Sequence, residues 1–80
     1  MKINEAIVFR FHELCDERKI KLNSLARLAG ISPSTVYSMA NSTRKEIKVN
    51  TVEALCEGLE ISIRQFFDSD IFDNIDPEIQ

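Results

Sequence analysis

Apolar residues recur at helical spacing in the first part of the chain. Ile7, Phe11 and Leu14 stand at positions i, i+4 and i+7, and polar residues separate them. This period places the apolar side chains on one face of a helix. Alternation with period two is scarce, and two glycines and two prolines supply little material for the tight turns of a β domain. The pattern therefore predicts an all-α fold whose first helix spans about residues 4–18.

The next apolar segment is short and ends at a glycine. Residues 23–29 are compatible with a helix, and Gly30 can adopt the left-handed conformation in which many helices end. Ser32 and Pro33 then mark a new start, because serine is a favourable N-cap and proline is tolerated at the first helical position. We predict two short helices, over 23–29 and 33–41, joined by three residues.

The second half of the chain predicts two more helices and a tail. The polar residues 41–48 indicate a loop, and a fourth helix follows with Asn50 or Thr51 as its cap. A fifth, short helix is expected to begin near Ser62. The expected buried stripe of the fourth helix is Val52, Leu55 and Leu59. The chain thus predicts a single compact five-helix bundle.

Two short helices joined by a three-residue connector with a glycine are the signature of a helix-turn-helix, whose second helix enters the DNA major groove. Apolar side chains close the inner angle, a small residue allows close approach, and glycine supplies the geometry of the turn. The predicted helix-turn-helix core is Leu25, Ala26, Gly30, Ile31, Val36 and Met39.

The net charge of −3 and the pI near 5.0 argue against a nucleic-acid partner when taken as averages. The charge is segregated, however. Residues 68–80 hold five acids and no basic residue, which leaves ten basic and eight acidic residues, a charge of +2, in residues 1–67. From Arg18 to Lys48 there are seven basic residues and one acid. We predict a helix-turn-helix DNA-binding domain, 1–67, and an acidic C-terminal tail, 68–80, which forms either a last amphipathic turn or a mobile extension.

These residues resemble the phage-repressor/Cro-like, or xenobiotic-response-element type, helix-turn-helix regulators. The resemblance rests on the six core residues above and on the downstream TVEALCEGLEISIRQFFDSD, and it covers about residues 4–67. It implies a lambda-repressor-like domain and a bacterial or phage transcriptional regulator, a repressor, that binds double-stranded DNA sequence-specifically. Many members have glycine after the fourth helix, where this chain has Glu60. That helix end is therefore expected either to be capped differently or to shift toward Gly58.

If Val36 and Met39 face the core, the polar side chains of the third helix lie on the opposite face. The candidates for base reading are Pro33, Ser34, Tyr37, Ser38 and Asn41. The helix has no Arg or Gln, so base readout is expected to be modest, with packing of Tyr37, the thymine methyl and DNA shape contributing. The candidates for phosphate contact are Lys21, Arg27, Ser32, Thr35, Ser42, Thr43, Arg44, Lys45 and Lys48.

Other function classes have less support. His12 and Cys15 share an i, i+3 spacing that metal ligands can use, but only Cys56 remains as a further soft ligand, so core packing of the cysteines is favoured. Without a nucleophile–base set or a glycine-rich phosphate loop, we expect no enzyme, metal or cofactor. The alternative left open is a protein-interaction module of the same fold, antitoxin-like or adaptor, with weak or no DNA binding.

Composition and chain pattern also bear on location and assembly. No apolar run approaches the roughly 18 residues of a membrane span, and no secretory segment is apparent. We therefore expect a reduced, cytoplasmic protein with no membrane partner and no evident small-molecule ligand. A single domain of this size covers little DNA, so a homodimer is expected at least on DNA, through the fifth helix and the start of the tail.

Overall fold

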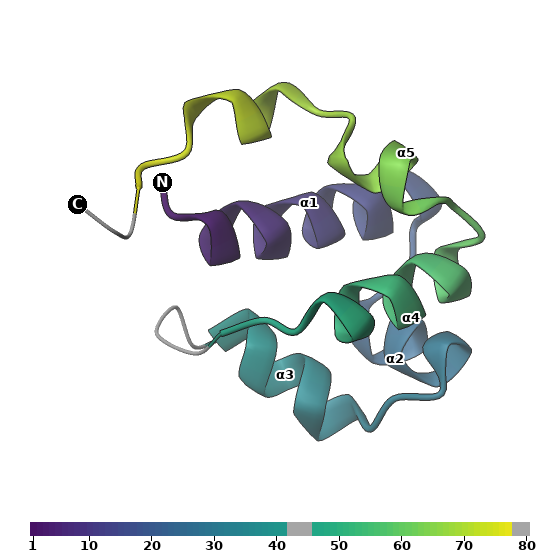
Figure 1. Cartoon of the computed structure of the whole chain (residues 1–80). Coiled ribbons are helices and arrows are strands. Elements are labelled where there is room, and N and C mark those ends of the chain that lie inside the picture. The colour runs from purple at the N-terminus through teal and green to yellow at the C-terminus, as the bar shows by residue number, and fades with distance from the viewer. Residues whose placement is uncertain (42–45, 78–80) are drawn as a thin grey trace.

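Helices make up all the regular structure in the part of the chain that the computed structural model describes, residues 1–41 and 46–77. They are α1 (Ile3–Arg18), α2 (Leu22–Ala29), α3 (Pro33–Asn41), α4 (Val49–Leu59), α5 (Ile63–Phe67) and a 3-10 helix, η1 (Asp70–Asn74). The all-α five-helix prediction is confirmed, and α2 and α3 form the predicted helix-turn-helix (Figure 1). Of the predicted polar loop, residues 42–45 lie outside the described residues, and residues 46–48 are not helical.

One apolar core joins the helices. The predicted stripe of α1 is buried, with Phe11 fully excluded from solvent, and Cys15 lies in the same cluster. From α4 the predicted residues Val52, Leu55 and Leu59 are also buried. The 3.6-residue period was a sound guide here because each helix has only one face against the core.

Glycine ends α2 as the sequence predicts. Gly30 has φ +70°, its amide donates to the carbonyl of Arg27 at 3.2 Å, and the amide of Ile31 donates to the carbonyl of Ala26 at 2.9 Å. These bonds satisfy carbonyls that would otherwise lack partners at the end of a helix.

The end of α4 uses a different residue. The helix continues through Gly58 to Leu59, and Glu60 takes the left-handed conformation with φ 58°. Of the two predicted alternatives, the shift toward Gly58 is therefore wrong. Gly58 instead lies where α4 approaches α2, since a Cβ at this position would be 3.0 Å from the backbone nitrogen of Ala29. Close packing of two backbones, not termination, accounts for this glycine.

The predicted cap of α4 is also wrong. The helix begins at Val49 with Lys48 as its N-cap, which places Asn50 and Thr51 inside the first turn. The carbonyl of Lys48 accepts from the amides of Thr51 and Val52, at 3.0 and 3.2 Å. These backbone bonds start the helix at Val49 without a capping side chain, so the polar residues that favour caps are not needed at its start.

A capping box starts α5. The hydroxyl of Ser62 accepts from the amide of Gln65 at 3.0 Å, and the side chain of Gln65 accepts from the amide of Ser62 at 2.8 Å. Phe66 projects into the core and packs on Phe11, with ring centroids 4.4 Å apart. The fifth helix therefore begins where the sequence predicts and closes the core.

The tail returns along α1 after α5 (Figure 1). Phe72 of η1 packs on Phe66 and Phe67, and the amide of Asp76 donates to the carbonyl of Met1 at 2.9 Å. The described part of the tail thus contains a short turn packed on the first helix, the first of the two predicted alternatives. The division into 1–67 and 68–80 stays a prediction, and residues 78–80 lie outside the described residues.

Two arginine side chains donate hydrogen bonds to backbone carbonyls at the ends of other helices. The guanidinium of Arg10 donates to the carbonyls of Phe66, at 2.8 Å, and Gln65, at 3.0 Å, and it pairs with Glu13 at 2.6 Å. Arg18 donates to the carbonyl of Leu59, the last residue of α4. Both side chains bind carbonyls that helix ends leave open, and a cation there is favourable.

Candidate nucleic-acid interface

The inner side of α3 anchors it to the domain. Val36 is 1% exposed and Met39 is 8% exposed, and both pack in the core with Leu25 and Ala26 of α2. Ile31, in the turn, is half-buried against the same cluster. Of the six residues predicted as the helix-turn-helix core, four are thus buried, Ile31 is half-buried, and Gly30 forms the turn. With its inner side held, α3 has one fixed outer face.

The outer face of α3 carries the candidate base-reading residues. All five are exposed: Pro33, Ser34, Tyr37, Ser38 and Asn41. Tyr37 is the most prominent, at 66% exposure. Two of the polar groups are already engaged within the chain, because the Asn41 amide donates to the carbonyl of Tyr37 at 2.8 Å and the hydroxyls of Ser32 and Ser34 are 2.8 Å apart. The face is polar, neutral and centred on one aromatic ring.

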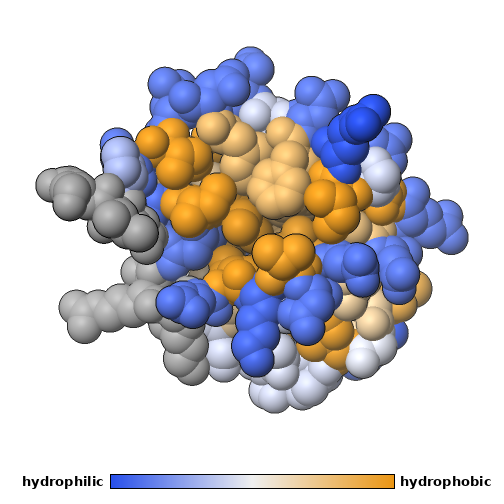
Figure 2. All heavy atoms as spheres, viewed as in Figure 1, coloured by the Kyte–Doolittle hydropathy of each residue, from blue (hydrophilic) through white to orange (hydrophobic). Residues whose placement is uncertain are grey.

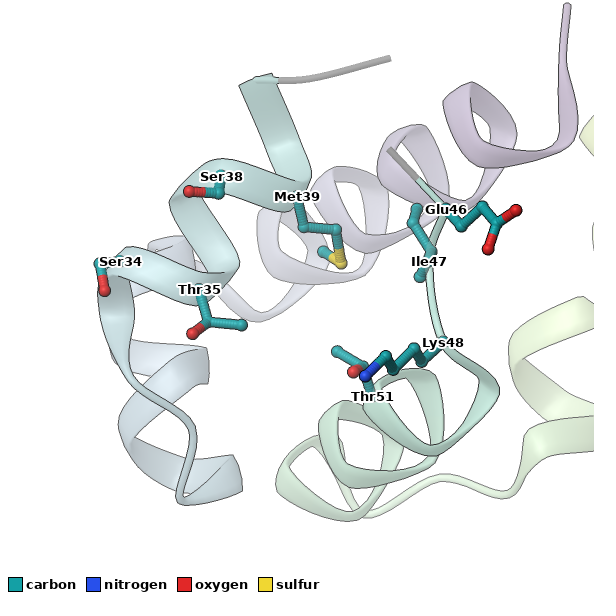
Figure 3. A pocket seen from close by; sticks show the side chains of 8 residues that line it. All are labelled: Ser34, Thr35, Ser38, Met39, Glu46, Ile47, Lys48 and Thr51. Carbon is teal, nitrogen blue, oxygen red and sulfur yellow. The ribbon is translucent and has the colours of Figure 1, made fainter. Parts of the chain in front are cut away.

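A groove of about 420 Å³ separates α3 from the start of α4 (Figure 3). Its lining residues are Ser34, Thr35, Ser38, Met39, Glu46, Ile47, Lys48 and Thr51. Figure 3 shows Thr35 and Met39 directed toward the groove, whereas the hydroxyl of Ser38 points away from it. The groove therefore brings together two candidate phosphate ligands, Thr35 of α3 and Lys48, the N-cap of α4.

The remaining described phosphate candidates lie at α2 and just before α3. Lys21 is the N-cap of α2, Arg27 is in its last turn, and Ser32 precedes α3; all three are exposed. Ser42, Thr43, Arg44 and Lys45 lie outside the described residues. Thr51 lines the groove but was predicted only as a cap. Its hydroxyl, three residues after Lys48 and so on the same side of the helix start, is the signal that could have identified it, because hydroxyl groups bind phosphate.

Charge is arranged around α3 rather than on it. Its nine residues include no ionisable acid or base other than the phenol of Tyr37. The acidic η1 segment lies on the opposite side of α1 from α3 (Figure 1). There the N-terminal ammonium group donates to Asp76 at 2.6 Å, and this hydrogen bond and its charge lower the pKa of that carboxyl group. The described acids of the tail are thus held away from the outer face of α3.

The cysteines occupy the core. Burial raises the pKa of the Cys15 thiol, and burial raises that of Cys56 to about 11. Both thiols are therefore protonated at neutral pH, as apolar packing favours. Residues 1–41 and 46–77 contain no group of three or more His, Cys, Asp or Glu side chains placed to hold a metal ion. Within the same residues, no helix has the length and apolar character required to cross a bilayer.

Comparisons with known proteins identify a matching family and solved structures of similar fold. The family model of the Cro/C1-type HTH DNA-binding domain matches residues 10–70. The crystal structure of the prophage Lp1 protein 11 is 30% identical, with a TM-score of 0.80, and the match covers 94% of this chain and 100% of that one. The wild-type restriction-modification controller protein C.Esp1396I is 16% identical, with a TM-score of 0.74 and 88% of each chain covered, and so shares the fold. A search of curated proteins found no match.

Proposed function

The chain belongs to the family of Cro/C1-type helix-turn-helix DNA-binding domains, and from this premise we propose that it is a sequence-specific transcriptional regulator that acts as a repressor. In this proposal α3 enters the major groove of double-stranded DNA, and binding at a promoter excludes the transcription machinery. In this proposal the protein acts in the cytoplasm, and it needs neither a catalytic residue nor a cofactor.

The outer face of α3 carries the proposal. A helix held by Val36 and Met39 presents exposed side chains at positions 33, 34, 37, 38 and 41, four of which carry polar groups, and this arrangement suits direct readout of base edges. The groove between α3 and α4 adds Thr35 and Lys48 at its border. In the proposed complex, phosphate groups contact these flanking residues while α3 meets the bases.

A homodimer supplies the second α3. Ile63 is 37% exposed and Phe67 is 39% exposed on α5, although Phe66 between them is fully buried. Figure 2 shows apolar side chains gathered on one face of the molecule, over α1 and the elements beside it. A two-fold pair that buries part of this surface would present two copies of α3 to a pseudo-palindromic site. Sedimentation with and without operator DNA tests this, and only monomers in both conditions would contradict it.

Replacing Lys48 with glutamine is expected to weaken binding to all DNA sequences about equally. Each phosphate charge that a protein neutralises contributes about 0.9 to the magnitude of the slope of log affinity against log salt concentration. The variant should lower that slope by about 0.9 per protomer and leave the preferred sequence unchanged. Binding isotherms at several salt concentrations, on a site selected from random DNA and on random DNA, provide the measurement.

Lys19→Gln is the matched control, because it removes the same charge from the C-cap of α1. It should keep the wild-type salt slope. Equal slopes for Lys48→Gln and the wild type would show that the groove is not a phosphate site. A wild-type protein that shows no salt-dependent DNA binding, but forms a salt-insensitive complex with another protein, would favour the protein-interaction module instead.

A further inference from the structure

We propose that α3 distinguishes its operator chiefly through the C5-methyl group of thymine, which packs against the ring of Tyr37. This inference rests on the proposed function and adds the class of base that the site prefers. Its starting point is the outer face of α3, where the side chain with the largest exposed apolar surface is Tyr37.

The other side chains of this face leave few distinctive hydrogen bonds. Recognition of guanine in the major groove is best served by Arg or Lys, and recognition of cytosine by a carboxylate, but α3 carries none of these groups. Asn41 could pair with adenine through its carboxamide, yet its NH₂ group already donates to the carbonyl of Tyr37 at 2.8 Å. Only the second N–H and the carboxamide oxygen are left for a base, and the bond to Tyr37 limits how far the side chain can reach from α3.

The serines do not supply the missing specificity. The hydroxyl of Ser34 is shared with Ser32 at 2.8 Å. A serine hydroxyl can both donate and accept, so it accommodates several bases. Hydrogen bonding by α3 thus separates the four base pairs weakly.

Apolar contact is what remains, and α3 is arranged for it. Pro33 and Tyr37 are i, i+4 neighbours on the exposed side of the helix, so their rings form one short apolar strip beside the hydroxyls of Ser34 and Ser38. Within the described residues, the aromatic contacts involve phenylalanines alone, which leaves the ring of Tyr37 available to a partner. In the major groove the one apolar group that separates base pairs is the methyl of thymine.

The experiment uses a duplex selected from random DNA by the wild-type protein. Each thymine is replaced singly by uracil, which removes the methyl group and keeps every hydrogen-bonding atom. At one or more positions in each half-site the affinity should fall about fourfold, the value expected when one buried methyl group is lost. At the same positions, a 5-methylcytosine–guanine pair should bind more tightly than a cytosine–guanine pair by a similar factor.

Three variants assign the effect to the ring. Tyr37→Phe keeps the ring and should retain the preference for thymine over uracil. Tyr37→Ser should bind thymine and uracil duplexes equally, with the salt slope of the wild type. Leu28→Ser, which removes an exposed apolar side chain from α2 instead, should retain the methyl preference. Circular dichroism checks that each variant is folded, as expected for changes at exposed sites.

The outcomes separate this inference from the proposed function. If the wild type binds DNA with a steep salt dependence but no thymine can be distinguished from uracil, the methyl inference is wrong and the regulator proposal stands. The same holds if Tyr37→Ser keeps the full methyl preference. If the wild type binds no duplex in a salt-dependent manner, both are overturned.

Discussion

Replacing Phe66 with alanine is expected to lower the free energy of unfolding by about 3–5 kcal/mol, the usual loss for a fully buried phenylalanine. The side chain packs on Phe11 at 4.4 Å, Phe67 at 4.9 Å and Phe72 at 6.0 Å between ring centroids, so its removal opens a cavity where α1, α5 and η1 meet. A domain of this size has a total stability of only about 4–12 kcal/mol. Urea denaturation followed by circular dichroism measures the loss.

Phe67→Ala provides the matched control, since it removes the same side chain from the next position of α5. Phe67 is 39% exposed and keeps contact mainly with neighbouring rings, so a loss of about 1 kcal/mol is expected, in the range of an aromatic pair. If the two variants lost equal stability, the burial of Phe66 would not be what holds α5. Phe67→Ala should also weaken the proposed dimer, which Phe66→Ala tests less cleanly because it strongly destabilises the domain.

Replacing Arg10 with alanine should lower the free energy of unfolding by about 2–3 kcal/mol. The guanidinium donates to the carbonyls of Phe66 and Gln65 and pairs with Glu13, and its side chain is 12% exposed. Hydrogen bonds to a charged group contribute about 1.5–3 kcal/mol, and the carbonyl of Phe66 would lose this donor. Arg10→Lys should recover only part of the loss, because an ammonium group does not match the planar fork that reaches two carbonyls.

Arg18→Ala tests whether this effect belongs to Arg10 in particular. Arg18 also donates to a carbonyl at a helix end, that of Leu59, but the residue is exposed. Its replacement should cost less than about 1 kcal/mol, as for other exposed charged contacts. Equal losses for the two arginines would contradict the view that Arg10 fastens α5 to α1 through a largely enclosed contact.

The helices and their buried faces could be predicted from the sequence because both depend on short-range pattern. Each stripe of apolar residues has the period of a helix, and Gly30 and Ser62 mark a helix end and a helix start by their own conformational preferences. Capping residues were a less reliable guide to helix ends where backbone hydrogen bonds alone were sufficient to start or end a helix. At α4, the carbonyl of Lys48 starts the helix ahead of Asn50 and Thr51, and Glu60 ends it without glycine.

Contacts between distant residues could not be predicted in the same way. The helical pattern of α1 places Arg10 on the polar side. Its contacts could not be predicted from this pattern, because its partners are carbonyls 55 and 56 positions later in the chain. The groove that joins Thr35 to Lys48 and Thr51 likewise depends on how α3 and α4 pack, not on spacing. The exposed face of α3 was predictable because the core positions of one helix fix its opposite side. Its contacts with DNA remain predictions.

Gly58 has a consequence for the length of the operator. The backbone of α4 lies against Ala29 so closely that a Cβ would be 3.0 Å from its nitrogen, and such contact leaves α2 and α4 no room to slide past each other. The helix-turn-helix is thereby joined rigidly to the helix that leads to α5. In the proposed dimer, the number of base pairs between the two half-sites is therefore fixed by the pairing of the two α5 surfaces. An operator with one base pair more or fewer would have to be met by twisting of the DNA, because α2 and α4 are packed too closely to shift.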